Sequence, residues 1–356
     1  MKFIFFFIQL IFGAIGFMRP PKHSRTTLKI SAGSKGWKSL EFKELYSSAT
    51  EYLDEDSVTR EVYSRTLGHW GETSNCSHFF YDPRTGYDYS ASAKYLRTIR
   101  CFWRAFSVGL ICSLRGITII AYNPDLSNRD WRIASFLVSA RGGFIFAPIS
   151  PRAVPSRFLW HNRITGPLPF ALSLSTALRL KKESKTPRAT LISFSGSLYE
   201  PRTTFLKELA GQCRAHGFEL TMKPRGPNGE RYPDAKYWQN LLSSVFVITT
   251  SDQTFTGRGD FEEIRQLTYR FTEATAAGAC LICNTPPGVE RYFIPNEHFI
   301  PVETPEDVIA VLEHYRDEPA YYHEIAASGR RRAEALCRGS AFWTAIDAAL
   351  GRYSLR

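Results

Sequence analysis

One carboxylate, Glu273, stands alone in a run of small and apolar residues between Tyr269 and Cys283. The run reads as a short helix that ends at Gly278 and continues directly into a buried strand. Folding gives no reason for a lone acid among so many alanines, because an unpaired buried charge is costly. Ligand binding does give one, since a carboxylate can accept hydrogen bonds from both hydroxyls of a ribose. The segment therefore predicts a binding site for a ribose-containing ligand.

A second candidate site follows the expected strand 190–195, where Gly196 and Ser197 precede a helix that begins near Thr203. Backbone amides and the helix dipole at such a turn form a natural anion site. Arg202 would add a planar fork of donors suited to a diphosphate. The alternative is an ordinary strand-to-helix turn with an arginine on the surface.

Three further cations are donor-side candidates. Lys223 and Arg225 follow the strand expected at 218–222, so we expect them at the same edge of the sheet. They would contact the base or the phosphates of the nucleotide. The alternative is a basic loop that faces solvent. Arg270 lies three residues before Glu273 and shares its helix face. It would neutralise a phosphate or orient Glu273, unless the two form a plain structural salt bridge.

The turn 286–290 follows the strand that ends at Cys283 and supplies two more candidates. Gly288 would let backbone amides approach a sugar or its phosphates. Glu290 would accept sugar hydroxyls, or it is a charge favoured by the helix dipole at a helix N-terminus.

These segments resemble, in order, the C-terminal half of GT-B glycosyltransferases. The block Arg270-x-x-Glu273-Ala274-x-x-Ala277-Gly278 is most similar to bacterial spore-maturation-type members and more loosely similar to exostosin-type ones. Further similar segments are the glycine loop at 194–202, the donor-side loop at 287–290, and the closing helices around 305–307 and 328–332. The resemblance covers about residues 188–345 and is absent from residues 1–110.

The resemblance implies an α/β fold of two Rossmann-like domains that face a cleft. It also implies that Glu273 binds the ribose of a nucleotide sugar, with Gly196 and Arg202 at the donor phosphates. The chain departs from the commoner retaining members, which carry a second glutamate eight residues before the first; Arg265 stands there. That departure puts two-carboxylate recognition of the sugar in doubt.

The implied reaction is displacement at the anomeric carbon, with the nucleoside diphosphate as leaving group. Amides and Arg202 would stabilise its developing charge. We find no metal-binding Asp-x-Asp motif, so no cofactor and no metal ion are expected. An inverting reaction needs a base, for which Asp125, His69 and His78 in the N-terminal half are candidates.

Charge is spread unevenly along the 356 residues, which are enough for two domains. Residues 1–186 hold 26 Lys and Arg against 13 Asp and Glu (+13), and residues 187–356 hold 19 against 21 (−2), which gives the net +11. A basic first half fits an acidic partner such as an anionic membrane surface, an anionic acceptor or nucleic acid, or it is an ordinary solvated surface. No nucleic-acid motif is present, so we expect no nucleic-acid partner.

The seven cysteines are scattered and odd in number, which does not fit a disulfide framework. Cys280-x-x-Cys283 lies in an apolar strand without a second ligand pair at metal spacing. Both residues are therefore interpreted as core cysteines.

The N-terminal segment 1–18 is apolar and is followed by several basic residues. It is a membrane anchor, a cleaved signal or the first buried strand. As an anchor, it would leave the catalytic part in the cytosol, because more positive charge follows than precedes it.

Four parts are expected along the chain. They are the segment 1–18, a basic acceptor-side α/β domain at 19–186, a nucleotide-sugar-binding Rossmann-like domain at 187–340, and a C-terminal helix at 341–356. Within them we expect an aromatic loop at 68–89, strands at 116–123 and 143–147, and a polar linker at 181–188.

The function expected from these features is transfer of a sugar from a nucleotide-diphosphate sugar to a glycan or lipid-linked acceptor. One alternative is an exostosin-like Golgi transferase of polysaccharide, which requires the segment 1–18 to be an anchor of opposite orientation. Another is a degenerate fold that binds nucleotide or glycan without turnover.

Overall fold

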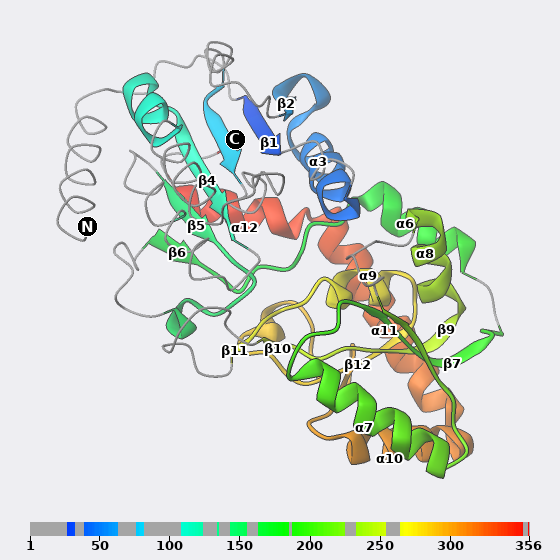
Figure 1. Ribbon diagram of the computed structural model, residues 1–356. Coiled ribbons are helices and arrows are strands. Elements are labelled where there is room, and N and C mark those ends of the chain that lie inside the picture. Colours follow the sequence, from blue (N-terminus) through cyan, green and yellow to red (C-terminus); the bar gives the residue numbers. More distant parts are fainter. Residues whose placement is uncertain are drawn as a thin grey trace. The chain divides into compact units, whose positions relative to one another are not determined.

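The computed structural model divides the chain into two compact units (Figure 1), the first comprising Met1–Leu168, Phe255–Phe261 and Trp343–Arg356 and the second comprising Pro169–Thr254 and Glu262–Phe342. Each unit contains its own parallel sheet, so the fold is α/β with two Rossmann-like sheets. The residues that the structure describes are 27–32, 39–62, 76–81, 108–123, 134, 143–154, 163–184, 187–224, 233–253, 264–351 and 355.

The units divide before Pro169, ahead of the linker expected at 181–188. A helix, α6 (Leu174–Glu183), occupies the first part of that stretch. It begins where the Ser173 hydroxyl accepts a hydrogen bond from the Thr176 amide at 3.3 Å. The charged residues near its end are exposed helix positions, which sequence alone does not distinguish from a polar linker.

Arg188, at the end of the expected linker, connects several elements of the second unit by hydrogen bonds. Its guanidinium donates to the carbonyls of Leu241, Leu242, Ser244 and Ala277 at 2.7–3.1 Å. Burial, and then the neighbouring Arg330, lowers the pKa of Arg188 to about 10. The carbonyls at the C-terminal ends of two helices stabilise this cation.

The first unit is built on a sheet of parallel strands in the order β2-β1-β3-β4-β5-β6. Continuous burial along β4 agrees with the apolar run that predicted a strand at 116–123. The strands are β1 (Leu28–Ala32), β2 (Val58–Val62), β3 (His78–Tyr81), β4 (Thr118–Tyr122), β5 (Phe144–Phe146) and β6 (Ile164–Thr165).

Strand β3 corrects the expectation of an aromatic loop at 68–89. His78 and the three aromatic residues after it are buried in the middle of the sheet. The polar residues around them concealed the strand pattern. His78 Nδ1 lies 2.8 Å from the hydroxyl of Ser77, so this ring is a core histidine.

Two helices of the first unit pack together although one lies at each end of the chain. They are α3 (Leu40–Leu53) and α12 (Ala341–Leu350). The indole of Trp343 donates to the Ser48 hydroxyl at 3.0 Å, and the Tyr52 hydroxyl donates to Asp347 at 3.1 Å. The expected C-terminal helix is therefore part of the first unit.

The second unit contains a parallel sheet in the order β13-β12-β9-β7-β8. Each strand expected between 190 and 283 is present within two residues of its expected bounds. The strands are β7 (Thr190–Gly196), β8 (Leu220–Pro224), β9 (Ser244–Ile248), β12 (Cys280–Cys283) and β13 (Ile300–Pro301). A separate antiparallel pair is formed by β10 (Asp252–Gln253) and β11 (Ile264–Arg265).

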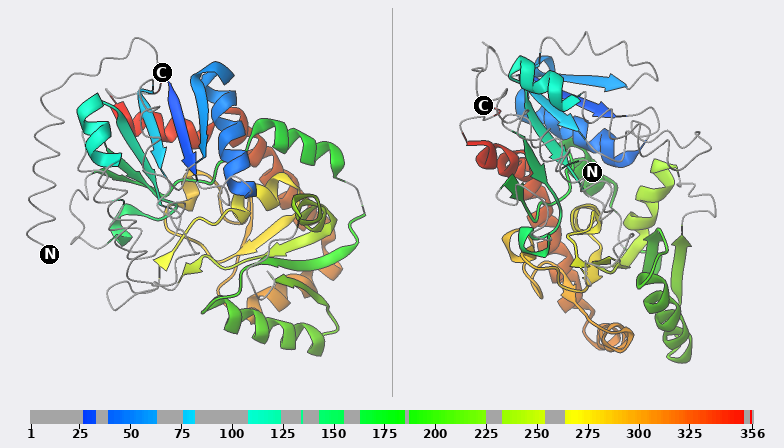
Figure 2. Two further views of the ribbon diagram at one scale, coloured as in Figure 1. Left: turned by 45° about the horizontal axis from the view of Figure 1, so that its top comes forward. Right: turned by 60° about the vertical axis from the view of Figure 1, so that its left-hand side comes forward.

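The helices of this unit cover both faces of its sheet (Figure 2). Besides α6, they are α7 (Arg202–Ala215), α8 (Asp234–Ser243), α9 (Arg270–Ala276), α10 (Pro305–Asp317) and α11 (Pro319–Arg338). Helix α10 begins at a complete capping box formed by Thr304 and Asp307, with Pro305 at its first position. Helices α7 and α10 lie side by side, and Gln212 and Glu306 hydrogen-bond between them.

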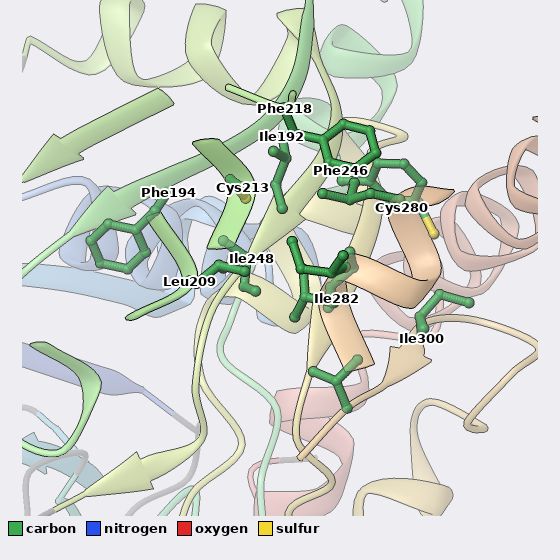
Figure 3. Close-up of a cluster of buried hydrophobic side chains, with 14 of the residues drawn as sticks. Ile192, Phe194, Leu209, Cys213, Phe218, Phe246, Ile248, Cys280, Ile282 and Ile300 are labelled. Carbon is green, nitrogen blue, oxygen red and sulfur yellow. The ribbon is translucent and has the colours of Figure 1, made fainter. Parts of the chain in front are cut away.

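Alternation along β7 divides the second unit into an apolar and a polar side. Ile192 and Phe194 join the buried cluster between the sheet and helices α7 and α10 (Figure 3). Ser193 and Ser195 point to the opposite face, because successive side chains of a strand alternate. Ser193 lies 2.7 Å from the hydroxyl of Ser244 at the end of α8. The functional candidates lie on and around this polar side.

The cysteine prediction is confirmed for the cysteines within the described part of the chain. Cys280 and Cys283 are free and buried, and only Cys280 belongs to the apolar cluster. Burial raises the pKa of both thiols, that of Cys283 to about 12. They are core cysteines without metal or redox partners among the described residues.

Among the helices within the described ranges, none is long and apolar enough to cross a membrane. The segment 1–18 lies outside those ranges.

Candidate functional site

Gly196 is the last residue of β7, and the loop that follows brings the Ser197 carbonyl next to Arg202, the first residue of α7. Arg202 is only 7% exposed. Its Nε donates to the Thr250 hydroxyl at 3.1 Å, its Nη2 to the Thr250 carbonyl at 2.7 Å and its Nη1 to the Ser197 carbonyl at 3.4 Å. Arg202 thus joins the end of β7 to the segment after β9 and is not a surface arginine.

The positive charge of Arg202 has no carboxylate partner within ion-pair distance among the described residues. Its guanidinium lies 4.3 Å from the Tyr199 ring centre. Burial lowers its pKa, and Arg270 acts in the same direction. A buried cation held only by neutral oxygens and a ring retains charge with which to attract an anion.

Glu273, in the first turn of α9, is completely buried at 0% exposure. Its Oε1 forms an ion pair with Arg270 Nη1 and accepts a hydrogen bond from the hydroxyl of Tyr237 on α8. Its Oε2 has no hydrogen-bond partner within the described part of the chain. The carboxylate is therefore fixed through one oxygen, while the other has acceptor capacity left.

Arg270 holds this arrangement against the sheet. Its Nη1 also donates to the Tyr237 hydroxyl, its Nη2 donates to the Ser195 carbonyl, and its guanidinium lies 5.0 Å from the Tyr237 ring centre. A Cβ on Gly196 would come within 3.3 Å of Arg270 Nη2. We call Ser195, Tyr237, Arg270 and Glu273 the carboxylate cluster; it joins β7, α8 and α9.

Lys223 lies beside the carboxylate cluster, because the register of β7 and β8 pairs it with Ser195. Its Nζ donates to Asn240 Oδ1 on α8 at 2.7 Å. Asn240 Nδ2 and the Ser195 hydroxyl are buried and have no partner among the described residues. These groups can donate and accept further hydrogen bonds at the carboxyl ends of β7 and β8, the edge where ligands bind in such sheets.

Gly288 and Glu290 lie in the turn after β12. Gly288 has a φ of 82°, which favours glycine, and directly precedes the short 3-10 helix η6 (Val289–Arg291). Glu290 is exposed. Within the described ranges, neither residue forms a hydrogen bond or ion pair with the carboxylate cluster.

Asp125, His69 and Arg225 lie outside the described residues. Their predicted roles stay predictions. His78 is buried in β3, where its Nδ1 lies 2.8 Å from the Ser77 hydroxyl, and its role as a base also stays a prediction.

Arg265, at the position where retaining members of the resembled family carry glutamate, is held by two carboxylates. Its Nε donates to Asp252 at 3.1 Å and its Nη1 to Glu303 at 2.9 Å. The hydrogen bond with Glu303 is the largest cause that raises its pKa. Arg265 therefore belongs to an ion-pair network that connects β10, β11 and the start of α10.

Sequence reasoning missed Tyr237, Asn240 and Ser195. The only available signal was the polar alternation of Ser193 and Ser195 in a parallel strand, where both faces are usually apolar. Nothing in the sequence pairs a tyrosine 36 residues away with Glu273.

One Asp-x-Asp triplet, Asp54-Glu55-Asp56, was also missed. All three residues are exposed in the turn after α3. Within the described part of the chain, no three His, Cys, Asp or Glu side chains form a possible metal site. Metal independence stays a prediction.

Part of the chain matches a known protein family. Residues 204–338 match the family model described as "Glycosyl transferase-like". No curated protein sequence is significantly similar to the chain.

Solved structures match over nearly the whole chain at low sequence identity. HepE from Anabaena, solved with UDP and glucose, is 10% identical with a TM-score of 0.55 over 92% of this chain and 100% of HepE. A glycosyltransferase from Rickettsia africae is 11% identical with a TM-score of 0.53 over 93% of this chain and 98% of its own. Sucrose-phosphate synthase from Thermosynechococcus elongatus is 10% identical with a TM-score of 0.50 over 92% and 98% of the two chains.

The two parallel Rossmann-like sheets, the matching structures and the matching family model lead to one conclusion. The chain has the GT-B glycosyltransferase fold, and its residues 204–338 match the model of a glycosyl transferase-like domain.

Proposed function

We propose that this protein transfers a sugar from a nucleoside-diphosphate sugar to an acceptor, with Glu273 as the ribose-binding carboxylate. The observation that carries the proposal is the buried Glu273, whose Oε1 is held by Arg270 and Tyr237 while Oε2 has no partner among the described residues. A buried charge with an unused acceptor is expensive unless a ligand group satisfies it. A ribose hydroxyl is such a group.

Arg202 is the second part of the proposal, as the cation that attracts the diphosphate. It begins α7, and its charge has no carboxylate partner in the described part of the chain. The amides of the Gly196–Ser197 turn and the α7 dipole favour an anion at the same place. Lys223, Arg225 and Arg270 remain our further candidates for contacts to the donor, and Gly288 and Glu290 for contacts to its sugar.

Transfer then breaks the bond between the anomeric carbon and the diphosphate oxygen, while an acceptor oxygen forms the new bond. Positive charge and amides aimed at the diphosphate stabilise the leaving group. Asp125 and His69 remain our candidates for the base that takes the acceptor's proton. We further expect transfer without a metal ion and association of the basic half with an anionic membrane surface.

The donor is tested by thermal shift with UDP, GDP, CDP, ADP and TDP on the wild type and on Glu273→Ala. UDP comes first because Anabaena HepE was solved with UDP and with UDP-glucose. A ligand that binds only the folded state adds about 2.7 kcal/mol of stability at 100 times its Kd. We expect one diphosphate to stabilise the wild type and not the variant.

Two further variants make this result specific. Glu273→Gln keeps the side-chain volume and removes the charge, so it is also expected to lose the shift. Glu183→Ala removes an exposed carboxylate that pairs with Arg179. This variant should keep the thermal shift caused by the diphosphate. Absence of a shift with all five diphosphates in a folded wild type contradicts the proposal.

A binding module without turnover is the second candidate, and Arg265 favours it. This side chain is engaged by Asp252 and Glu303, where the resembled retaining enzymes have a sugar-binding glutamate. Release of free nucleotide from a nucleotide sugar in the presence of acceptors indicates a transferase. Saturable binding without release indicates the module.

A further inference from the structure

Tyr237 is the member of the carboxylate cluster that α8 contributes. Its hydroxyl accepts a hydrogen bond from Arg270 Nη1 and donates one to Glu273 Oε1. Its ring packs edge-on against Trp238 at 5.5 Å between ring centres and lies under the Arg270 guanidinium. The hydroxyl is therefore held in one place by contacts with two other side chains.

The contacts of Glu273 divide its two oxygens into an occupied and an unused one. A carboxylate oxygen has about two acceptor positions. Oε1 uses both of them, one for Arg270 and one for Tyr237. Oε2 uses none among the described residues. Because the side chain is fully buried and its Oε1 is held from two directions, the carboxylate cannot exchange its oxygens without breaking both contacts.

We propose that Tyr237 is a positioning residue that occupies Oε1, so that the site recognises the donor's ribose through Oε2 alone and requires only one of its two hydroxyls. This inference rests on the proposed function and adds a substrate class to it. A carboxylate with two free oxygens would bind the 2′ and 3′ hydroxyls together. This carboxylate discriminates between them, so a nucleotide that lacks the hydroxyl not contacted remains a ligand.

The test compares Kd values for UDP, 2′-deoxy-UDP and 3′-deoxy-UDP, and for the corresponding three guanosine diphosphates, by isothermal titration calorimetry. A hydrogen bond to a charged group corresponds to about tenfold or more in affinity. For the wild type we expect one deoxy analogue to bind within about threefold of the parent and the other to bind at least about tenfold more weakly.

In Tyr237→Phe an acceptor position on Oε1 becomes free, and the carboxylate loses one of its two restraints. We expect the two deoxy analogues to bind within about threefold of each other, because both hydroxyls now find an acceptor. A ratio of two affinities in the same variant is insensitive to a general loss of stability.

Tyr322→Phe is the matched control. Tyr322 is also buried in the second unit, and its hydroxyl lies 3.0 Å from His314 Nδ1 in the apolar cluster. Loss of the Tyr322 hydroxyl should leave the ratio of the Kd values of the two deoxy analogues at its wild-type value.

The outcomes separate this inference from the proposed function. Equal weakening of both deoxy analogues in the wild type, or an unchanged ratio in Tyr237→Phe, overturns the role of Tyr237 alone. A wild type that binds none of UDP, GDP, CDP, ADP and TDP overturns both.

Discussion

Replacement of Arg270 by methionine is expected to lower the free energy of unfolding by about 3–5 kcal/mol, because it leaves the charge of Glu273 buried without its cationic partner. Glu273 is 0% exposed, so water cannot compensate for the lost ion pair. The hydroxyl of Tyr237 would be the only group left on Oε1 among the described residues. Urea denaturation measures the loss as a lower midpoint at an unchanged slope.

Two variants isolate the buried charge as the cause. Arg270→Met combined with Glu273→Gln removes the charge as well and should recover most of the lost stability, since the amide still accepts from Tyr237. Arg179→Met breaks the exposed Arg179–Glu183 pair, which is 3.1 Å long, and should cost at most about 0.5 kcal/mol. If Arg270→Met costs no more than Arg179→Met, the pair is not the strongly coupled unit described above.

Replacement of Gly329 by alanine is the second change with a large expected effect. Gly329 lies in α11, and a Cβ there would stand 2.5 Å from the His298 carbonyl oxygen and 3.4 Å from Thr275 Cγ2. The first obstacle is backbone, so it cannot rotate away. We expect a net loss of about 1–3 kcal/mol, although alanine is the better helix former by about 1 kcal/mol.

Gly211→Ala is the control for Gly329→Ala. Gly211 is also inside a helix, α7, but a Cβ there meets no atom within 4 Å. Alanine should stabilise the protein at this position by about 0.5–1 kcal/mol. Equal effects of the two substitutions in the same denaturation experiment would contradict a close contact between α11 and the segment around His298.

Local features of the sequence were enough to predict the helices and strands of the second unit. The capping box of Thr304 and Asp307 starts α10, and Gly217, at a φ of 72°, follows the end of α7. Such signals act between residues close in the chain, so they are visible in the sequence itself. The continuous apolar runs of β4 and β12 are typical of parallel strands, and they predicted the α/β class for the same local reason.

The same local reasoning went wrong where tertiary packing outweighed composition. His78–Tyr81 form a central buried strand although polar and aromatic residues surround them in the sequence. Charged residues near 181–188 predicted a linker, but the stretch contains the end of α6 and the half-buried Arg188. Burial by the rest of the fold, which no short window contains, decided both cases.

For the candidate site, the sequence by itself singled out Glu273, because an acid is conspicuous among small apolar residues. It also predicted the helix that carries this side chain and the strand that follows it. It did not contain the partners: Tyr237 is 36 residues from Glu273, and Ser195 is 75 residues from Arg270. The strand order β12-β9-β7-β8 brings α8 and α9 to the same side of β7, and only that order makes these side chains neighbours. Sequence determines local structure through nearby residues, whereas a buried cluster depends on which strands pair, and tertiary structure alone decided that.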